Sequence, residues 1–249
     1  MGKIPAEYLP PSELRPHRIY ALPEYNNIPQ QLNSTEELLD KTVAAGKGDR
    51  VALYFEDKRI PYKALLAQVN KLGSALKKLG IEEADRVALR LPNIPPAIVA
   101  NFAVLKIGAV VLPTSVLFSR AEIAHVFNNA EVKAVIVAAT LLEELEKAVP
   151  ELRTVKHIIV VGGEPEEIKK KGYVLYQELL DGGDPKCDPV RRDRMDVSVL
   201  LFTSGTTGLP KGTAHFMEEA LIVPDGFGKH CWRLTEEDVL LSAAPHAMA

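Results

Sequence analysis

Apolar residues follow two different spacings along most of the chain, and each spacing predicts one kind of element. Short runs rich in β-branched residues predict strands, at residues 51–55, 86–91, 109–112, 132–138, 157–161, 197–202 and 238–243. Longer apolar or amphipathic segments predict helices, at residues 34–42, 62–79, 95–107, 119–128, 141–149, 176–180 and 216–230, the last broken near Pro224. From residue 50 the two kinds of element alternate, which is typical of an α/β fold with largely parallel sheets flanked by helices.

The first 49 residues differ from the rest of the chain. Residues 1–33 contain six prolines and show neither helical nor alternating spacing of apolar positions. Such a segment cannot form a regular element of its own over that length. We therefore expect an extended N-terminal arm over residues 1–49, lying on the surface of an α/β domain that covers residues 50–249.

Composition and charge narrow the class of protein. The chain has 249 residues, of which 47% are hydrophobic and 25% charged, so it can bury a core and is not intrinsically disordered. Its net charge of −3 argues against sequence-independent nucleic-acid binding. The charge-free stretches on either side of Lys106, residues 91–105 and 107–119, are shorter than the ~20 apolar residues that span a bilayer. Two cysteines cannot build a disulfide framework, so we expect a cytoplasmic protein without a membrane span.

One motif carries recognisable chemistry. The apolar run at 197–202 continues directly into Thr-Ser-Gly-Thr-Thr-Gly-Leu-Pro-Lys-Gly, residues 203–212. Glycines allow backbone N–H groups to approach an anion, hydroxyls donate to phosphate oxygens, and a lysine adds positive charge. The segment lacks the spacing of a Walker A loop and of G-x-G-x-x-G. We expect it to form a loop between a strand and a helix, at the carboxyl end of the strand, where open sheets bind ligands.

This decapeptide resembles the phosphate-binding signature of the adenylate-forming superfamily, which includes acyl-CoA synthetases, luciferases and adenylation domains. Residues 60–65 and 103–113 are similar to two further stretches of that family. The resemblance therefore covers most of residues 50–249. Parts of residues 22–40, and residues 211–215, are similar to benzoate- and 2-aminobenzoate-CoA ligases.

The resemblance implies an ATP-dependent acid–CoA ligase that acts on a small carboxylic acid, specifically an aromatic one such as benzoate or 2-aminobenzoate. The acid would first react with Mg-ATP to form an acyl-adenylate, and coenzyme A would then displace AMP. Charge neutralisation on the phosphates is the physical requirement of the first step. The residues implied to bind the nucleotide phosphates are Thr203, Ser204, Gly205, Thr206, Thr207, Gly208 and Lys211, with Thr203 also beside Mg²⁺.

Two histidines have alternative interpretations. His215 lies four residues after Lys211, where the related ligases also carry a histidine, and either borders the nucleotide or acyl pocket or simply begins a helix. His246 follows the strand expected at 238–243, in a segment that lines the acyl pocket in the family, and is otherwise an ordinary loop residue. We take both as candidate substrate-binding residues. No catalytic residue is assigned.

The enzymes that this chain resembles are considerably longer. Their magnesium-binding Glu, their ribose-binding Asp and the mobile domain with the catalytic lysine are all expected after residue 249. This favours the N-terminal portion of an acyl-CoA synthetase large domain. The alternative is a non-catalytic nucleotide-binding or interaction module. Without those later elements the apolar residues 239–244 would lack neighbours, so we also expect a homo-oligomer.

The 249-residue chain alone is predicted to show no measurable acid–CoA ligation, because only the phosphate loop of the required parts lies within it. Pyrophosphate release with benzoate, 2-aminobenzoate or a fatty acid measures this directly. A Lys211→Ala chain serves as the background control. Release above that background would contradict the prediction.

Overall fold

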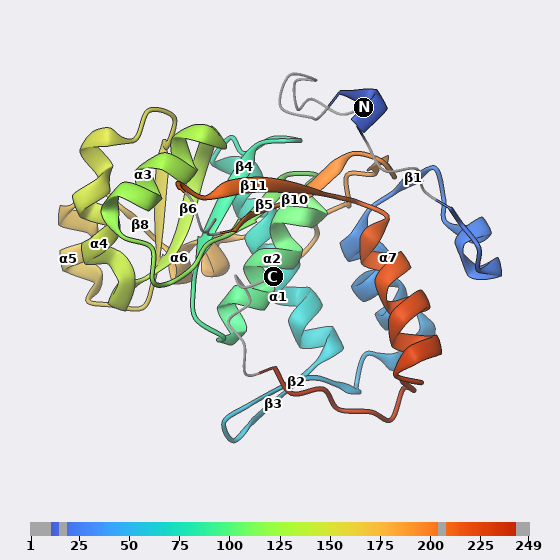
Figure 1. The fold of residues 1–249 in the computed structure, drawn as a ribbon. Coiled ribbons are helices and arrows are strands. Elements are labelled where there is room, and N and C mark those ends of the chain that lie inside the picture. The colour runs from blue at the N-terminus through green and yellow to red at the C-terminus, as the bar shows by residue number, and fades with distance from the viewer. Residues whose placement is uncertain (1–10, 15–18, 204–207, 243–249) are drawn as a thin grey trace.

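The computed structural model describes residues 11–14, 19–203 and 208–242. Within these residues a seven-stranded sheet has the order β11-β10-β5-β4-β6-β7-β8, and two small sheets pair β1 with β9 and β2 with β3 (Figure 1). The strands are β1 (Gln31–Leu32), β2 (Val51–Phe55), β3 (Lys58–Pro61), β4 (Arg86–Arg90), β5 (Val110–Pro113), β6 (Val132–Ala138), β7 (His157–Val161), β8 (Val174–Leu175), β9 (Arg192–Asp193), β10 (Val197–Thr203) and β11 (Lys211–Phe216).

Helices connect most of these strands. The α-helices are α1 (Tyr62–Lys78), α2 (Pro95–Lys106), α3 (Arg120–Asn129), α4 (Leu142–Ala148), α5 (Pro165–Lys170), α6 (Tyr176–Gly182) and α7 (Glu219–Val223). Shorter 3₁₀ or π segments are η2 (Ser12–Leu14), η3 (Pro23–Asn27), η4 (Glu36–Asp40), η5 (Val43–Lys47), η6 (Ala139–Leu141), η7 (Val149–Glu151) and η8 (Pro224–Cys231). Among the described residues, no helix combines the length and the apolar character needed to cross a membrane.

The large sheet is mainly parallel, as the alternation of strands and helices predicts. β10, β5, β4, β6, β7 and β8 pair in parallel, and β11 alone of its described strands pairs antiparallel, with β10. Ser119 and Glu122 form a capping box at the start of α3. The α/β fold class is therefore confirmed.

Alternate residues of the central strands feed two separate hydrophobic cores. On one face, Val87 and Leu89 of β4 belong to the core formed with α1, α2 and α6. On the other face, Ala88 of β4 and Leu112 of β5 belong to the core formed with α3, α4 and α5 (Figure 1). Because helices cover both faces, the central strands are continuous apolar runs rather than alternating ones.

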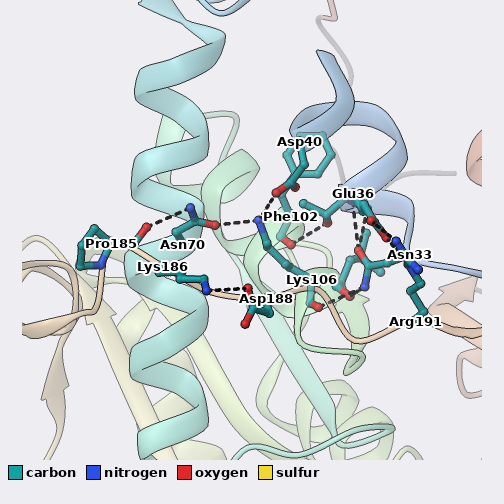
Figure 2. Close-up of polar contacts among 12 residues, drawn as sticks. Asn33, Glu36, Asp40, Asn70, Phe102, Lys106, Pro185, Lys186, Asp188 and Arg191 are labelled. Carbon is teal, nitrogen blue, oxygen red and sulfur yellow. Dashed lines mark hydrogen bonds and ion pairs between the residues drawn. The ribbon is translucent and has the colours of Figure 1, made fainter. Parts of the chain in front are cut away.

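The N-terminal arm is anchored by buried groups and does not simply lie on the surface, and the helix expected at residues 34–42 is present. Asn33 is fully buried and its Oδ1 accepts the backbone N–H groups of Thr35 and Glu36 at 3.0 and 3.2 Å, which caps the helical segment that follows. Its Nδ2 donates to the backbone carbonyl oxygens of Leu105, Lys106 and Val190 at 2.8, 3.1 and 2.8 Å (Figure 2). One side chain therefore joins the arm to the end of α2 and to the segment before β9.

A buried lysine completes this attachment. Lys106, at the end of α2, is 1% exposed, and its Nζ lies 2.5 Å from Oδ1 of Asp40 on η4 and 2.7 Å from Oδ1 of Asn70 on α1 (Figure 2). Burying an ammonium group is unfavourable unless it is paired and hydrogen-bonded. The contact therefore fixes the relative positions of these three helical segments.

Two predicted elements near the end of the described chain differ in the structure. The helix expected at 216–230 begins later, because Phe216 is the last residue of β11 and the helical turns are those of α7 and η8. Residues 238–242 form no strand, and Val239 and Leu241 are exposed. A strand requires a neighbour for its backbone hydrogen bonds, and no described strand pairs with these residues.

Removal of the carboxylate beside Lys106 should destabilise the fold. Asp40→Asn leaves the buried ammonium without its counter-charge, and we expect a loss of about 3 kcal/mol in the free energy of unfolding. Urea unfolding followed by circular dichroism measures it. The matched control is Glu37→Gln in the same helical segment, since Glu37 pairs with the exposed Lys41 and should contribute little. Equal losses in the two variants would contradict the proposed role of Lys106.

Candidate functional site

The loops after β4 and β5 leave the sheet toward opposite faces. The chain continues from β4 into α2, in one core, and from β5 into α3, in the other. Diverging loops of this kind open a crevice at the carboxyl ends of neighbouring parallel strands, where open α/β sheets bind their ligands. β10 lies parallel beside β5, so the loop after β10 emerges at the same edge (Figure 1). We call this edge the switch-point edge.

The glycine- and hydroxyl-rich segment connects two antiparallel strands. β10 ends at Thr203 and β11 begins at Lys211, so the expected strand–loop–helix order is wrong, whereas its place at the carboxyl end of a strand is confirmed. β11 forms here because β5 pairs with β10 on one side only and leaves its other side open. Residues 211–216 satisfy the hydrogen-bonding groups on its other side.

Thr203 and Lys211 oppose each other in the last pair of this hairpin. Side chains of directly opposed residues lie on the same face, with Cβ atoms ~5 Å apart. Both residues are exposed, and Lys211 forms no ion pair with any residue that the structure describes. A hydroxyl and an unpaired ammonium at the base of one loop fit a phosphate group.

The remaining predicted residues fall into three groups. Gly208 is exposed, with open space around its Cα. Ser204, Gly205, Thr206, Thr207 and His246 lie outside the described residues. His215 lies on the same face of β11 as Lys211 but ~13 Å further along the strand. Its Nδ1 lies 2.8 Å from Oε2 of Glu219, so the structure separates this imidazole from the base of the loop.

His125 is a contact of the loop that the sequence pattern does not indicate. It lies in the middle of α3, and its Nε2 is 3.0 Å from the backbone carbonyl oxygen of Pro210. A ring N–H at this nitrogen would donate to that carbonyl. α3 begins directly after the loop that follows β5, so this contact joins the two loops of the switch-point edge. Nothing in the local spacing of apolar residues distinguishes His125, because the contact is formed only in the folded chain.

Arg90 is the second residue of this region that sequence reasoning missed. It ends β4 at the switch-point edge, and its side chain is 1% exposed. Its guanidinium donates to the backbone carbonyl oxygens of Ser115, Val116 and Phe118 at 2.7, 3.0 and 3.1 Å. Burial lowers the pKa of the Arg90 guanidinium, against the opposing charges of Glu144 and Glu122. A charged residue closing an apolar strand was the one signal available in the sequence.

Comparison with known proteins defines the family. The sequence profile described as "AMP-binding enzyme" matches residues 40–249. An acetyl-coenzyme A synthetase of Bacillus subtilis is 31% identical over 214 residues, which is 84% of this chain and 36% of that protein. A 3-hydroxybenzoate/4-hydroxybenzoate–CoA ligase of Thauera aromatica is 28% identical over 193 residues, 78% of this chain and 36% of that protein. The chain therefore belongs to the AMP-binding enzyme family, and it spans about a third of the length of these relatives.

Solved structures share the fold. An anthranilate CoA ligase in complex with anthranoyl-AMP matches with a TM-score of 0.77 and 23% identity, over 82% of this chain and 38% of that one. A benzoate CoA ligase from Burkholderia xenovorans matches with a TM-score of 0.74 and 22% identity, over 86% of this chain and 40% of that one. The arrangement of sheet and helices described above is therefore shared with part of each of these two ligases.

Proposed function

We propose that this chain supplies the phosphate-binding part of an ATP-dependent acid–CoA ligase. In the first step a carboxylate oxygen attacks the α-phosphorus of ATP, which forms an acyl-adenylate and releases pyrophosphate. In the second step the thiolate of coenzyme A attacks the acyl carbon, and AMP leaves. The observation that carries the proposal is that Thr203 lies opposite Lys211 at the switch-point edge of a family member, and that Lys211 is exposed and forms no ion pair with any described residue.

The role of the loop follows from charge. Pyrophosphate carries away negative charge in the first step, and a fixed ammonium stabilises that charge as it develops. Lys211 supplies the ammonium, while the hydroxyls of Thr203, Ser204, Thr206 and Thr207 and the backbone beside Gly205 and Gly208 supply hydrogen bonds. Mg²⁺, when bound, would neutralise the phosphates further, with Thr203 as the residue beside it. Hydroxyl oxygens and phosphate oxygens are the hard donors that Mg²⁺ prefers.

The two histidines remain assigned to the acyl side of the site. His215 shares a face of β11 with Lys211, so a ligand that extends from the loop along that strand would approach it. Its ring already has Glu219 as a partner, which would hold the imidazole in one orientation. His246 belongs to this proposal on the family resemblance alone.

We further propose that the acid is aromatic, such as benzoate or 2-aminobenzoate. The fold matches an anthranilate and a benzoate CoA ligase, and a hydroxybenzoate–CoA ligase is among the relatives in sequence. Acetyl-coenzyme A synthetases are also among those relatives. The substrate class therefore needs its own experiment.

Lys211→Ala should slow adenylation more than thioester formation, because pyrophosphate is present only in the first step. We expect about a hundredfold loss in the adenylation rate and little change when the acyl-adenylate is supplied directly. Rapid-quench measurements on the complete natural polypeptide that contains these residues separate the two steps. Lys156→Ala is the matched control, because Lys156 is an exposed lysine directly before β7, at the amino ends of the parallel strands. Equal losses in both steps would assign Lys211 a structural role.

The substrate class is tested with the same polypeptide. Pyrophosphate release with benzoate or 2-aminobenzoate should exceed release with acetate by about tenfold or more in kcat/KM, since a pocket shaped for a ring binds a two-carbon acid poorly. Acids of intermediate size, such as butyrate and hexanoate, complete the series. A preference for acetate would contradict the aromatic assignment and leave the role of Lys211 intact.

A further inference from the structure

We propose that Arg90 is a positioning residue of the nucleotide site, ordering the loop after β5 and, through α3, the base of the loop after β10. The inference deepens the proposed function and rests on it for the identity of the ligand. The claim that Arg90 orders the two loops depends only on contacts within the chain. Those contacts form one continuous chain from the end of β4 to Pro210.

The first contact in this chain is the guanidinium itself. Arg90 holds three carbonyl oxygens from residues 115–118 with two nitrogen atoms, at 2.7 to 3.1 Å. The preceding residue, Thr114, is anchored to β4 by its N–H, which donates to the carbonyl oxygen of Leu89 at 3.0 Å. The loop between β5 and α3 is therefore fastened to β4 at both ends of its turn.

The second part of the chain is the start of α3. Ser119 follows the fastened turn directly and forms the capping box with Glu122, whose Oε2 accepts the N–H of Ser119 at 2.9 Å and its hydroxyl at 2.7 Å. The helix is then held by buried residues such as Ile123 and Phe127. His125 projects from this helix to the carbonyl oxygen of Pro210, one residue before Lys211.

Arg90 differs from Arg86, the other arginine of β4 that binds backbone carbonyls, in lacking a described carboxylate partner. Arg86 on the same strand also holds backbone carbonyls, yet it forms an ion pair with Glu131 at 2.8 Å. Arg90 has no carboxylate within ion-pairing distance among the described residues, and its Nε has no hydrogen-bond partner there. An incompletely compensated buried cation is unfavourable for stability alone. At the switch-point edge it adds positive potential where the proposed function places phosphates.

Amide hydrogen exchange on the 249-residue chain tests the chain of contacts without any ligand. Arg90→Met should raise exchange at residues 114–119 and also at residues 208–212 by about tenfold, because opening of the first loop releases the second. His125→Phe should raise exchange at 208–212 only. The double variant should match Arg90→Met at 208–212, since both changes break one path.

Arg86→Met is the matched control, because it removes a carbonyl-binding guanidinium from the opposite end of β4. It should affect exchange near residues 84–86 and 130–132 and leave 208–212 unchanged. Urea midpoints of all variants allow exchange to be compared at equal global stability. If Arg90→Met does not fold, Arg90→Gln, which retains two amide donors, replaces it. Unchanged exchange at 208–212 in the Arg90 variant, or an equal rise there in Arg86→Met, would overturn the proposal.

Titration calorimetry with Mg-ATP separates this inference from the proposed function. Arg90→Met should weaken Mg-ATP binding by about tenfold, whereas Arg86→Met should not. A wild-type chain that binds no Mg-ATP would count against the proposed function, and the exchange result would still decide the role of Arg90. Normal Mg-ATP affinity in the Arg90 variant, with exchange raised at 114–119 alone, would refute it.

Discussion

Burial of the parallel sheet on both faces is the constraint on which the rest of the molecule depends. Parallel strands joined by crossover helices are stable only when those helices cover the sheet. Here residues of alternate parity on β4 and β5 enter two different cores, one with α1, α2 and α6 and one with α3, α4 and α5. The connections must therefore leave the sheet toward both faces. Their divergence after β4 and β5 is what creates a ligand-binding edge at all.

Two buried cationic side chains, Lys106 and Arg90, have different surroundings and therefore different roles. Lys106 and Arg90 are each 1% exposed, and each lies where apolar helices or strands end. Asp40 neutralises the charge of Lys106, the amide oxygen of Asn70 accepts a hydrogen bond from it, and these contacts stabilise the attachment of the arm. Among the described residues, the guanidinium of Arg90 donates to carbonyl oxygens of the loop after β5 and forms no ion pair with a carboxylate. Lys106 therefore stabilises the fold, whereas the proposed role of Arg90 is to position the nucleotide site.

The hairpin of β10 and β11 brings two residues of the candidate site together. Pairing with β11 brings Thr203 opposite Lys211, so two groups eight residues apart lie at the base of one loop. In the next pair, Gly212 lies opposite Phe202, where a Cβ would come within 3.0 Å of the Phe202 ring. His125 then fixes the Pro210 carbonyl from the other side. The candidate phosphate site is therefore assembled from the sheet and from a helix distant in sequence.

The order of residues along the chain is enough to predict the class of fold, most strands and helices, and the location of the loop at the end of the 197–202 strand. These features depend on the spacing of apolar residues and on local turn chemistry, which neighbours along the chain decide. Residues 211–216 form a strand for a reason that the local pattern does not contain, because they pair with β10 at the open side of the sheet. The folded chain also sets the roles of Asn33, Arg90, Lys106 and His125, each of which has partners between 25 and 157 residues away. The spacing of residues along the chain does not reveal such roles, because the backbone and side-chain groups that pair with a buried polar residue come from distant segments.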